Sequence, residues 1–303
     1  MIIDKFKCND GYEIHTTIWN KVDKPIGVIQ LIHGMTSYGA QFDNFATKLN
    51  EAGYIAFADD HRSHGNTSGV DKLGVSKADN FNKCVSDEIE ITDMLIDKYS
   101  LPVQIFAHSY GSFLAQRYIQ LASDKISGII LSASAYMNNR LFMGKLITFF
   151  QRLFFGLEKP DNLLYKMTYL ANDKPFADEN MPNAWLSRDP KVVDEYNQDE
   201  LCNYICSIGF YYSMMRALPL TYKTSNLEKI RKNLPIYIAS GSQDPLGGMG
   251  ERVKELKEMY ENLSIENIKM DLFEGARHQL TNDPEKDTII PQFIAFYNRN
   301  IGK

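Results

Sequence analysis

Three residue types that together perform nucleophilic catalysis occur in one order along this 303-residue chain: Ser109, Asp244 and His278. A serine hydroxyl is a poor nucleophile until a base accepts its proton, and a histidine base needs a carboxylate that holds its tautomer. Each of the three follows a separate apolar, strand-like run by a few residues. The order predicts a triad in which Ser109 attacks, His278 moves the proton and Asp244 orients His278.

Ser109 lies in the run I-F-A-H-S-Y-G-S-F at residues 105–113. An apolar segment precedes this run and a helix-like segment, residues 113–121, follows it. The pattern strand, sharp turn and helix is typical of the G-x-S-x-G turn that exposes a nucleophile, here with Ala107 in place of the first glycine. The pattern alone is moderately specific, and the alternative is a serine in an ordinary strand–helix loop.

The other two members of the triad also have ordinary alternatives. Asp244-Pro245 is able to start a turn and cap the helix that follows, and His278 is able to be a surface-loop histidine. The three residues together, in this order and each after a strand, favour the catalytic interpretation.

A tetrahedral intermediate requires hydrogen-bond donors for its oxyanion. We expect the backbone N–H groups of Tyr110, which follows Ser109, and of Met35, which follows His33-Gly34, to supply them. The alternative is that His33-Gly34 forms a glycine turn with no role at the site.

The elements that would position these residues alternate between strands and helices. This alternation predicts an α/β fold with a mostly parallel central sheet covered by helices, and a ligand site outside the carboxyl ends of its strands. Asn9-Asp10-Gly11 predicts a hairpin between the first two strands. The predicted strands span 2–8, 12–19, 28–32, 54–58, 102–107, 126–132, 235–240 and 268–273, and the predicted helices of this part span 41–52, 80–99, 113–121, 251–260 and 287–300.

Residues 136–222 lack the alternation: 141–157 is rich in phenylalanine, and helices are predicted at 189–196 and 201–218. We therefore expect a sheet domain made of residues 1–135 and 223–303, with 136–222 inserted as a helical cap. The apolar residues of the phenylalanine-rich stretch either pack the cap on the core or face a lipid surface as an amphipathic lid, with Lys145 and Arg152 at the headgroups. Those apolar residues are Leu146, Phe149, Phe150, Leu153 and Phe154.

Composition excludes several classes of protein. The formal charge is −5 and no stripe of lysine and arginine is present, so nucleic acid is not an expected partner. No apolar run reaches the roughly 18–20 residues that span a bilayer. The four cysteines form no C-x-x-C pair, and Cys202 and Cys206 suit one face of a helix. Reduced thiols and the lack of a visible signal peptide predict a cytoplasmic protein.

The remaining histidines raise the question of a metal. His61 and His64 are three residues apart, but no third set of ligands at metal spacing is visible, so we expect them to form structural hydrogen bonds. No metal and no cofactor is expected. The side chain of His108 should point away from the substrate, if its strand is regular.

Several motifs resemble the α/β-hydrolase fold, and within it the monoglyceride lipase and lysophospholipase group. His33-Gly34-Met35 resembles the H-G oxyanion loop of that group, and residues 60–65, D-H-R-S-H-G, resemble its D-H-R-G-H-G run. In the cap, residues 186–196 resemble its S-R-D-P-x-V-V segment, and Lys174-Pro175-Phe176 also fits. The chain departs from the group at its nucleophile turn, A-H-S-Y-G-S instead of G-H-S-M-G-G, and at Gln279, where glutamate often stands.

The resemblance implies a serine carboxylic-ester hydrolase that acts on a small-molecule acyl ester, a monoacylglycerol or a lysophospholipid, through an acyl-enzyme. Three alternatives stay open: a serine aminopeptidase with a cap, an acyltransferase, and a non-catalytic binding protein of the same fold. An aminopeptidase requires a cap carboxylate for the free amine of its substrate, and Glu158, Asp161 and Asp178 are candidates. Haloalkane and epoxide chemistry is disfavoured, because those hydrolases have Asp at the position of Ser109.

Overall fold

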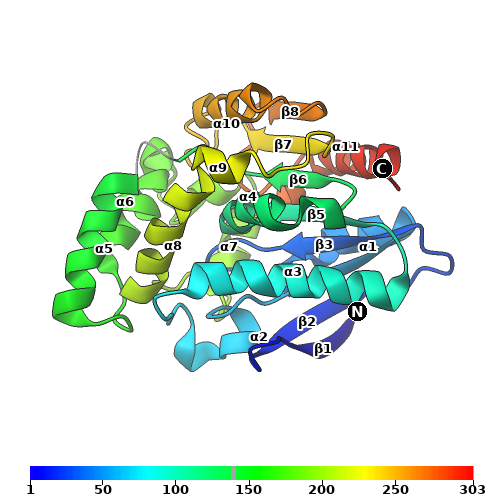
Figure 1. The fold of residues 1–303 in the computed structure, drawn as a ribbon. Coiled ribbons are helices and arrows are strands. Elements are labelled where there is room, and N and C mark those ends of the chain that lie inside the picture. The colour runs from blue at the N-terminus through cyan, green and yellow to red at the C-terminus, as the bar shows by residue number, and fades with distance from the viewer. Residues whose placement is uncertain (138–140, 303) are drawn as a thin grey trace.

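The structure, a computed structural model, describes residues 1–137 and 141–302. It contains an eight-stranded sheet in the order β1-β2-β4-β3-β5-β6-β7-β8 (Figure 1). β1 and β2 form the expected hairpin, β2 runs antiparallel to β4, and all other neighbours are parallel. The mostly parallel sheet is thus confirmed. The strands are β1 (Ile2–Lys7), β2 (Glu13–Trp19), β3 (Gly27–Ile32), β4 (Tyr54–Asp59), β5 (Val103–His108), β6 (Ile129–Ser132), β7 (Ile236–Gly241) and β8 (Ile268–Phe273).

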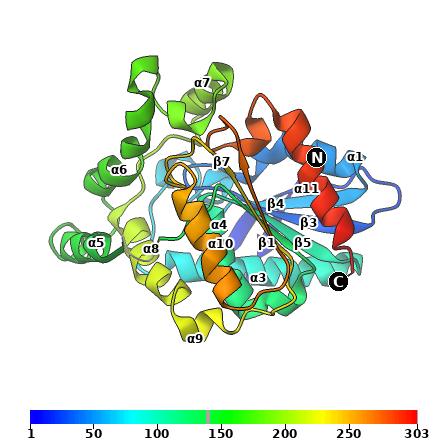
Figure 2. The same ribbon diagram turned by 90° about the horizontal axis from the view of Figure 1, so that it is seen from above.

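Helices cover both faces of the sheet (Figure 2). α1 (Asp43–Glu51) and α11 (Lys286–Arg299) lie on one face, and α3 (Asn80–Tyr99), α4 (Tyr110–Ala122) and α10 (Glu251–Asn262) lie on the other. Central strands are apolar on both sides, because successive side chains point to opposite faces. In β3, Ile29 and Leu31 pack in the core on the side of α1 and α11, while Val28 and Ile32 pack in the core on the side of α3, α4 and α10.

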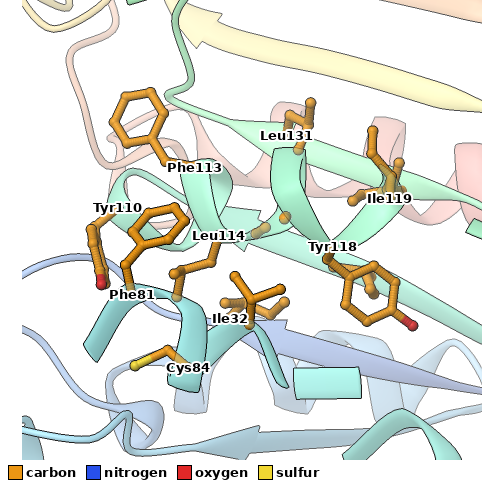
Figure 3. Packing of buried hydrophobic residues seen from close by; sticks show 14 of the residues in the cluster. Ile32, Phe81, Cys84, Tyr110, Phe113, Leu114, Tyr118, Ile119 and Leu131 are labelled. Carbon is orange, nitrogen blue, oxygen red and sulfur yellow. The ribbon is translucent and has the colours of Figure 1, made fainter. Parts of the chain in front are cut away.

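The larger core fills the space between β3, β5, α3 and α4 (Figure 3). Phe81 and Cys84 of α3 face Leu114 and Tyr110 of α4, and Ile32 of β3 packs in the same cluster from the side of the sheet. This packing fixes α4 against the sheet, so the residue at the start of α4 has a rigid support.

The cap helices gather beyond one end of the sheet, most of them at the left of Figure 1. They are α5 (Leu141–Phe155), α6 (Asn162–Thr168), α7 (Pro190–Gln198) and α8 (Ile208–Thr221). Phe210, Met215 and Leu218 of α8 belong to the same buried cluster as the sheet core, so α8 also anchors the cap. The division at residues 136 and 222 stays a prediction. The short helices α2 (Gly65–Ser68) and α9 (Thr224–Leu227) complete the α-helices of the described residues.

The prediction of a helix over 201–218 was wrong at its start. Ser207 caps α8 by accepting a hydrogen bond from the Phe210 N–H, so the helix begins at Ile208. Cys202 and Cys206 therefore precede the helix and do not share one of its faces. None of the helices within 1–137 and 141–302 has the length and apolar character needed to cross a bilayer.

Candidate active site

Ser109 occupies the sharp turn between β5 and α4. Its backbone has φ 54° and ψ −119°, a conformation that non-glycine residues rarely adopt. Gly111 makes the turn sterically feasible, because a Cβ there would lie 2.5 Å from the carbonyl oxygens of Ile32 and His33. The strained turn projects the hydroxyl clear of the backbone at the carboxyl end of β5.

The structure brings the three sequence-predicted side chains together. His278 Nε2 lies 2.8 Å from Ser109 Oγ, and His278 Nδ1 lies 2.8 Å from Asp244 Oδ2. Asp244 follows β7 and His278 follows β8, and both side chains are buried. The two loops approach closely because Gly241 has no side chain; a Cβ there would lie 2.1 Å from the Ala276 carbonyl oxygen.

The loop after β3 lies directly beside the serine. A Cβ on Gly34 would lie 3.1 Å from Ser109 Cβ, so glycine lets the loop approach the serine without displacing it. Met35 and Tyr110 both line the pocket at Ser109. No hydrogen bond to either backbone N–H is formed by any group in the described part of the chain. Both N–H groups are therefore available to an oxyanion.

A model of the family described as serine aminopeptidase, S33, matches residues 23–285. The chain belongs to this family. Family membership and the sheet order together establish the α/β-hydrolase fold, and the protein is a hydrolase of that fold.

Several proteins that are similar to this chain are named as lipases or esterases. A monoacylglycerol lipase from Mycolicibacterium smegmatis is 23% identical over 291 residues, which are 92% of this chain and 91% of the relative. The monoglyceride lipase of Homo sapiens is 25% identical over 277 residues, 89% of this chain and 81% of the relative. A thermostable carboxyl esterase from Bacillus coagulans, solved with glycerol, superimposes with a TM-score of 0.88 at 25% identity, covering 99% and 98% of the two chains.

A cap segment holds the loop that carries His278. The Trp185 ring lies 4.4 Å from the His278 ring, and the Leu186 carbonyl accepts a hydrogen bond from Gln279 N–H. Arg277 is buried: its guanidinium donates to the Ala184 and Ser187 carbonyls and to Glu179, and it lies over the Phe176 ring. These contacts of Arg277 were not predicted from the sequence, although residues 174–176 and 186–188 lie in the motifs shared with the resembled group.

The pocket above Ser109 has a volume of about 870 Å³, including its mouth, and a mostly apolar wall. The prediction that His108 points away from this space was wrong. Its ring lies 4.8 Å from the His278 ring at the edge of the pocket, because β5 ends at His108 and the chain turns. Burial, and next the nearby His278, hold the pKa of His108 well below its usual range, so its ring is neutral. The apolar wall includes Phe113, Met137, Leu141, Met214, Met215, Leu218 and Leu246.

A second polar group is buried behind the loop after β3. The donor atoms of Asp59, His61 and Glu88 lie within 4.8 Å of one another, a spacing at which a metal ion could bind. His61 Nδ1, however, lies 2.8 Å from Asp59 Oδ2, which is the distance of a hydrogen bond. The three groups are therefore assigned as an ion cluster. Glu88 was not recognised from the sequence, because an acidic residue in an amphipathic helix is normally solvated.

Proposed function

We propose that the protein hydrolyses carboxylic esters of long acyl chains, of the monoacylglycerol or lysophospholipid type, through an acyl-enzyme. The observation that carries this proposal is the Ser109–His278–Asp244 hydrogen-bond chain at the floor of an apolar pocket. The printed names of the relatives, monoacylglycerol lipase and carboxyl esterase, support it.

In the proposed mechanism, His278 Nε2 accepts the proton of Ser109 Oγ while the oxygen attacks the ester carbonyl carbon. The Asp244 carboxylate accepts a hydrogen bond from His278 Nδ1–H, which keeps Nε2 free to act as the base and stabilises the imidazolium. The N–H groups of Met35 and Tyr110 bind the oxyanion. His278 then protonates the leaving alcohol, and water, deprotonated by the same ring, releases the acid.

The pocket wall favours an ester of a fatty acid over an aminoacyl substrate. A free amine would need a carboxylate partner in the pocket, and no aspartate or glutamate among the described residues lines it. Glu158 and Asp178 are exposed, and Asp161 is buried as the N-cap of α6. The family description as an aminopeptidase and the acyltransferase reaction remain alternatives that a substrate panel separates.

Replacing Met214 by tryptophan should shorten the acyl pocket. Met214 lies on α8 and lines the pocket wall. Each buried methylene contributes about 0.8 kcal/mol, so excluding two or three of them should lower kcat/KM for a p-nitrophenyl dodecanoate by roughly 30-fold. The butyrate ester should lose less than about threefold. The measurement is kcat/KM over esters of graded chain length, with monoglycerides, lysophosphatidylcholine and aminoacyl amides included.

Met214→Leu, which conserves volume, serves as the matched control and should leave the chain-length profile unchanged. Equal loss on short and long esters in Met214→Trp would contradict the assignment of this wall to the acyl chain. A preference of the unsubstituted protein for aminoacyl amides would favour the aminopeptidase alternative.

We also propose that α5 contacts a lipid surface. Only Leu141, Gly144 and Thr148 of this helix are buried, so the alternative that its apolar residues pack the cap on the core is not supported. Phe142 and Phe154 are each 76% exposed. Cations lie among these rings, with the Arg152 guanidinium 5.2 Å from the Phe149 ring and Lys159 beside Phe155. The exposed apolar residues are Phe142, Met143, Leu146, Phe149, Phe150, Leu153, Phe154 and Phe155.

The double substitution Phe150→Glu with Leu153→Glu should weaken binding to phosphatidylcholine vesicles containing phosphatidylglycerol by at least about tenfold, because it removes apolar area and adds negative charge. Vesicle co-sedimentation measures the effect. The matched control, Ile3→Glu with Leu121→Glu, changes exposed apolar residues away from the cap and should bind as the unsubstituted protein does. Equal binding of the two double variants would overturn the lipid contact.

A reducing compartment such as the cytoplasm is the proposed location. All four cysteines carry free thiols and are buried. Thiols that are never paired are typical of reducing compartments.

A further inference from the structure

An ion cluster lies beneath the loop that carries Met35. Asp59 ends β4, His61 follows it, and Glu88 belongs to α3; each side chain is at most 2% exposed. His61 Nδ1 lies 2.8 Å from Asp59 Oδ2 and 3.2 Å from Glu88 Oε1. Gln30 Nε2 donates to the other oxygen of Glu88 at 2.6 Å. Burying charged groups is costly unless they are paired, so this arrangement implies compensating charges.

The contacts of His61 define its protonation. Nε2 lies 3.1 Å from the His33 carbonyl oxygen, which can only accept, so Nε2 carries a proton. Nδ1 lies at hydrogen-bond distance from the Asp59 carboxylate, which can only accept, so Nδ1 also carries a proton. Burial alone would lower the pKa of His61, but Asp59 and Glu88 raise it well above its ordinary value. Burial, and next the charge of Asp59, raise the pKa of Glu88 to about 8.

The other titratable side chains near His61 come from four elements. The His33 ring stacks on the His61 ring at 3.8 Å, and the neighbouring rings are neutral: burial, then the charge of His61, lower the pKa of His33 and of His64. The titratable side chains near His61 are His33 after β3, His64 before α2, Cys84 of α3 and Tyr110 of α4.

His33 connects His61 to the loop that carries Met35 through two hydrogen bonds. The His61 backbone N–H donates to His33 Nε2 at 2.9 Å, so the proton of this neutral ring is on Nδ1. Nδ1–H in turn donates to the Gly34 carbonyl oxygen at 2.8 Å. The Gly34 carbonyl and the Met35 N–H belong to one planar trans peptide and point in opposite directions. Fixing the carbonyl therefore fixes the direction of the Met35 N–H.

We propose that His61 is a positioning residue: as an imidazolium held by Asp59 and Glu88, it fixes His33 on both its carbonyl and its ring, and thereby aims the Met35 N–H at the oxyanion. This inference rests on the proposed function for the role of the Met35 N–H. The protonation state and the hydrogen bonds of His61 do not depend on it.

The first experiment measures ring protonation in the unsubstituted protein by nitrogen-15 NMR of labelled histidine. Both nitrogens of His61 should stay protonated up to at least about pH 8, well beyond a free histidine. A His61 ring that is neutral at pH 7 overturns the proposal. This measurement needs no turnover, so its failure is distinct from failure of the ester-hydrolase assignment, which the ester panel decides.

The second experiment compares two substitutions of His61. In His61→Asn the amide takes the place of Nδ1, so contact with the carboxylates is kept and the donor to the His33 carbonyl is lost. In His61→Gln the amide takes the place of Nε2, so this donor is kept. Because loss of one oxyanion donor lowers kcat by about 10²–10³, we expect kcat on p-nitrophenyl butyrate to fall at least about tenfold in His61→Asn, with KM nearly constant.

His61→Gln should lose at least about fivefold less kcat than His61→Asn. Gln104→Leu removes a buried hydrogen bond to the Tyr297 carbonyl far from the site, and it controls for a general loss of stability. Equal kcat losses in the two His61 variants, or a folded His61→Asn with unchanged kcat, overturn the proposal. If His61→Asn does not fold, the NMR measurement decides.

Discussion

Replacement of Ser109 by alanine is expected to lower kcat for p-nitrophenyl esters by a factor on the order of 10⁵–10⁶. The proposed nucleophile is lost, while the backbone N–H groups and the pocket remain. The turnover that remains should come only from stabilisation of the oxyanion by these N–H groups and from substrate binding in the pocket. Because the backbone of Ser109 is strained and alanine adopts that conformation no more easily, the free energy of unfolding should change little. Steady-state kinetics and urea unfolding measure the two effects.

A fluorophosphonate probe provides an independent measurement, since it labels only an activated serine. The unsubstituted protein should be labelled and Ser109→Ala should not. Ser86→Ala, an exposed serine on α3 whose hydroxyl donates to the Asn82 carbonyl, should keep both labelling and kcat. Turnover retained by Ser109→Ala would remove the basis of the proposed reaction, and labelling absent from the unsubstituted protein would favour the non-catalytic alternative.

Asp244→Asn is expected to lower kcat by about 10⁴ without loss of the fold. Asp244 Oδ1 accepts a hydrogen bond from the Leu246 N–H at 2.9 Å, and Oδ2 faces His278 Nδ1. In the asparagine variant the Leu246 contact keeps the amide oxygen in place, so the amide NH₂ must face Nδ1. Nδ1 then becomes an acceptor and the proton moves to Nε2, where the ring cannot accept the proton of Ser109.

The control for this substitution is Asp271→Asn on β8, whose carboxylate accepts from the Tyr237 hydroxyl away from the site. It should leave kcat unchanged. Rates and thermal unfolding of both variants are measured side by side. A loss of less than tenfold in a folded Asp244→Asn would show that Asp244 does not set the tautomer of His278.

The sequence predicted elements well where a regular pattern continued to a clear end. The helix at 80–99 and the strand at 268–273 have the predicted bounds, because apolar periodicity and flanking polar residues define both. The start of α8 was wrong because one hydrogen bond of Ser207 decides it, and hydrophobic spacing continues through Cys202 and Cys206. Local capping outweighed periodicity at this point.

The residues proposed for catalysis were predicted from their order and from their positions after strands, because the carboxyl ends of parallel strands meet at one edge of the sheet. β5, β7 and β8 place Ser109, Asp244 and His278 there. Contacts that depend on how the cap lies on the core, such as Arg277 with Glu179, could not be predicted, since no sequence pattern joins the two segments. The pairing of Glu88 with His61 was missed because an acidic residue in an amphipathic helix is normally solvated.

The hydrogen bonds between Arg277 and the cap carbonyls have a consequence for the design of chimeras between homologous proteins of this family. The segment 184–188 supports the proposed base directly, so it belongs functionally to the core although it lies in the cap sequence. A chimera that takes its substrate-facing helices from another homologue should therefore retain residues 176–188 of the recipient. Exchanging that segment as well would change the lipid preference and, at the same time, remove the contacts that hold His278, the proposed proton acceptor.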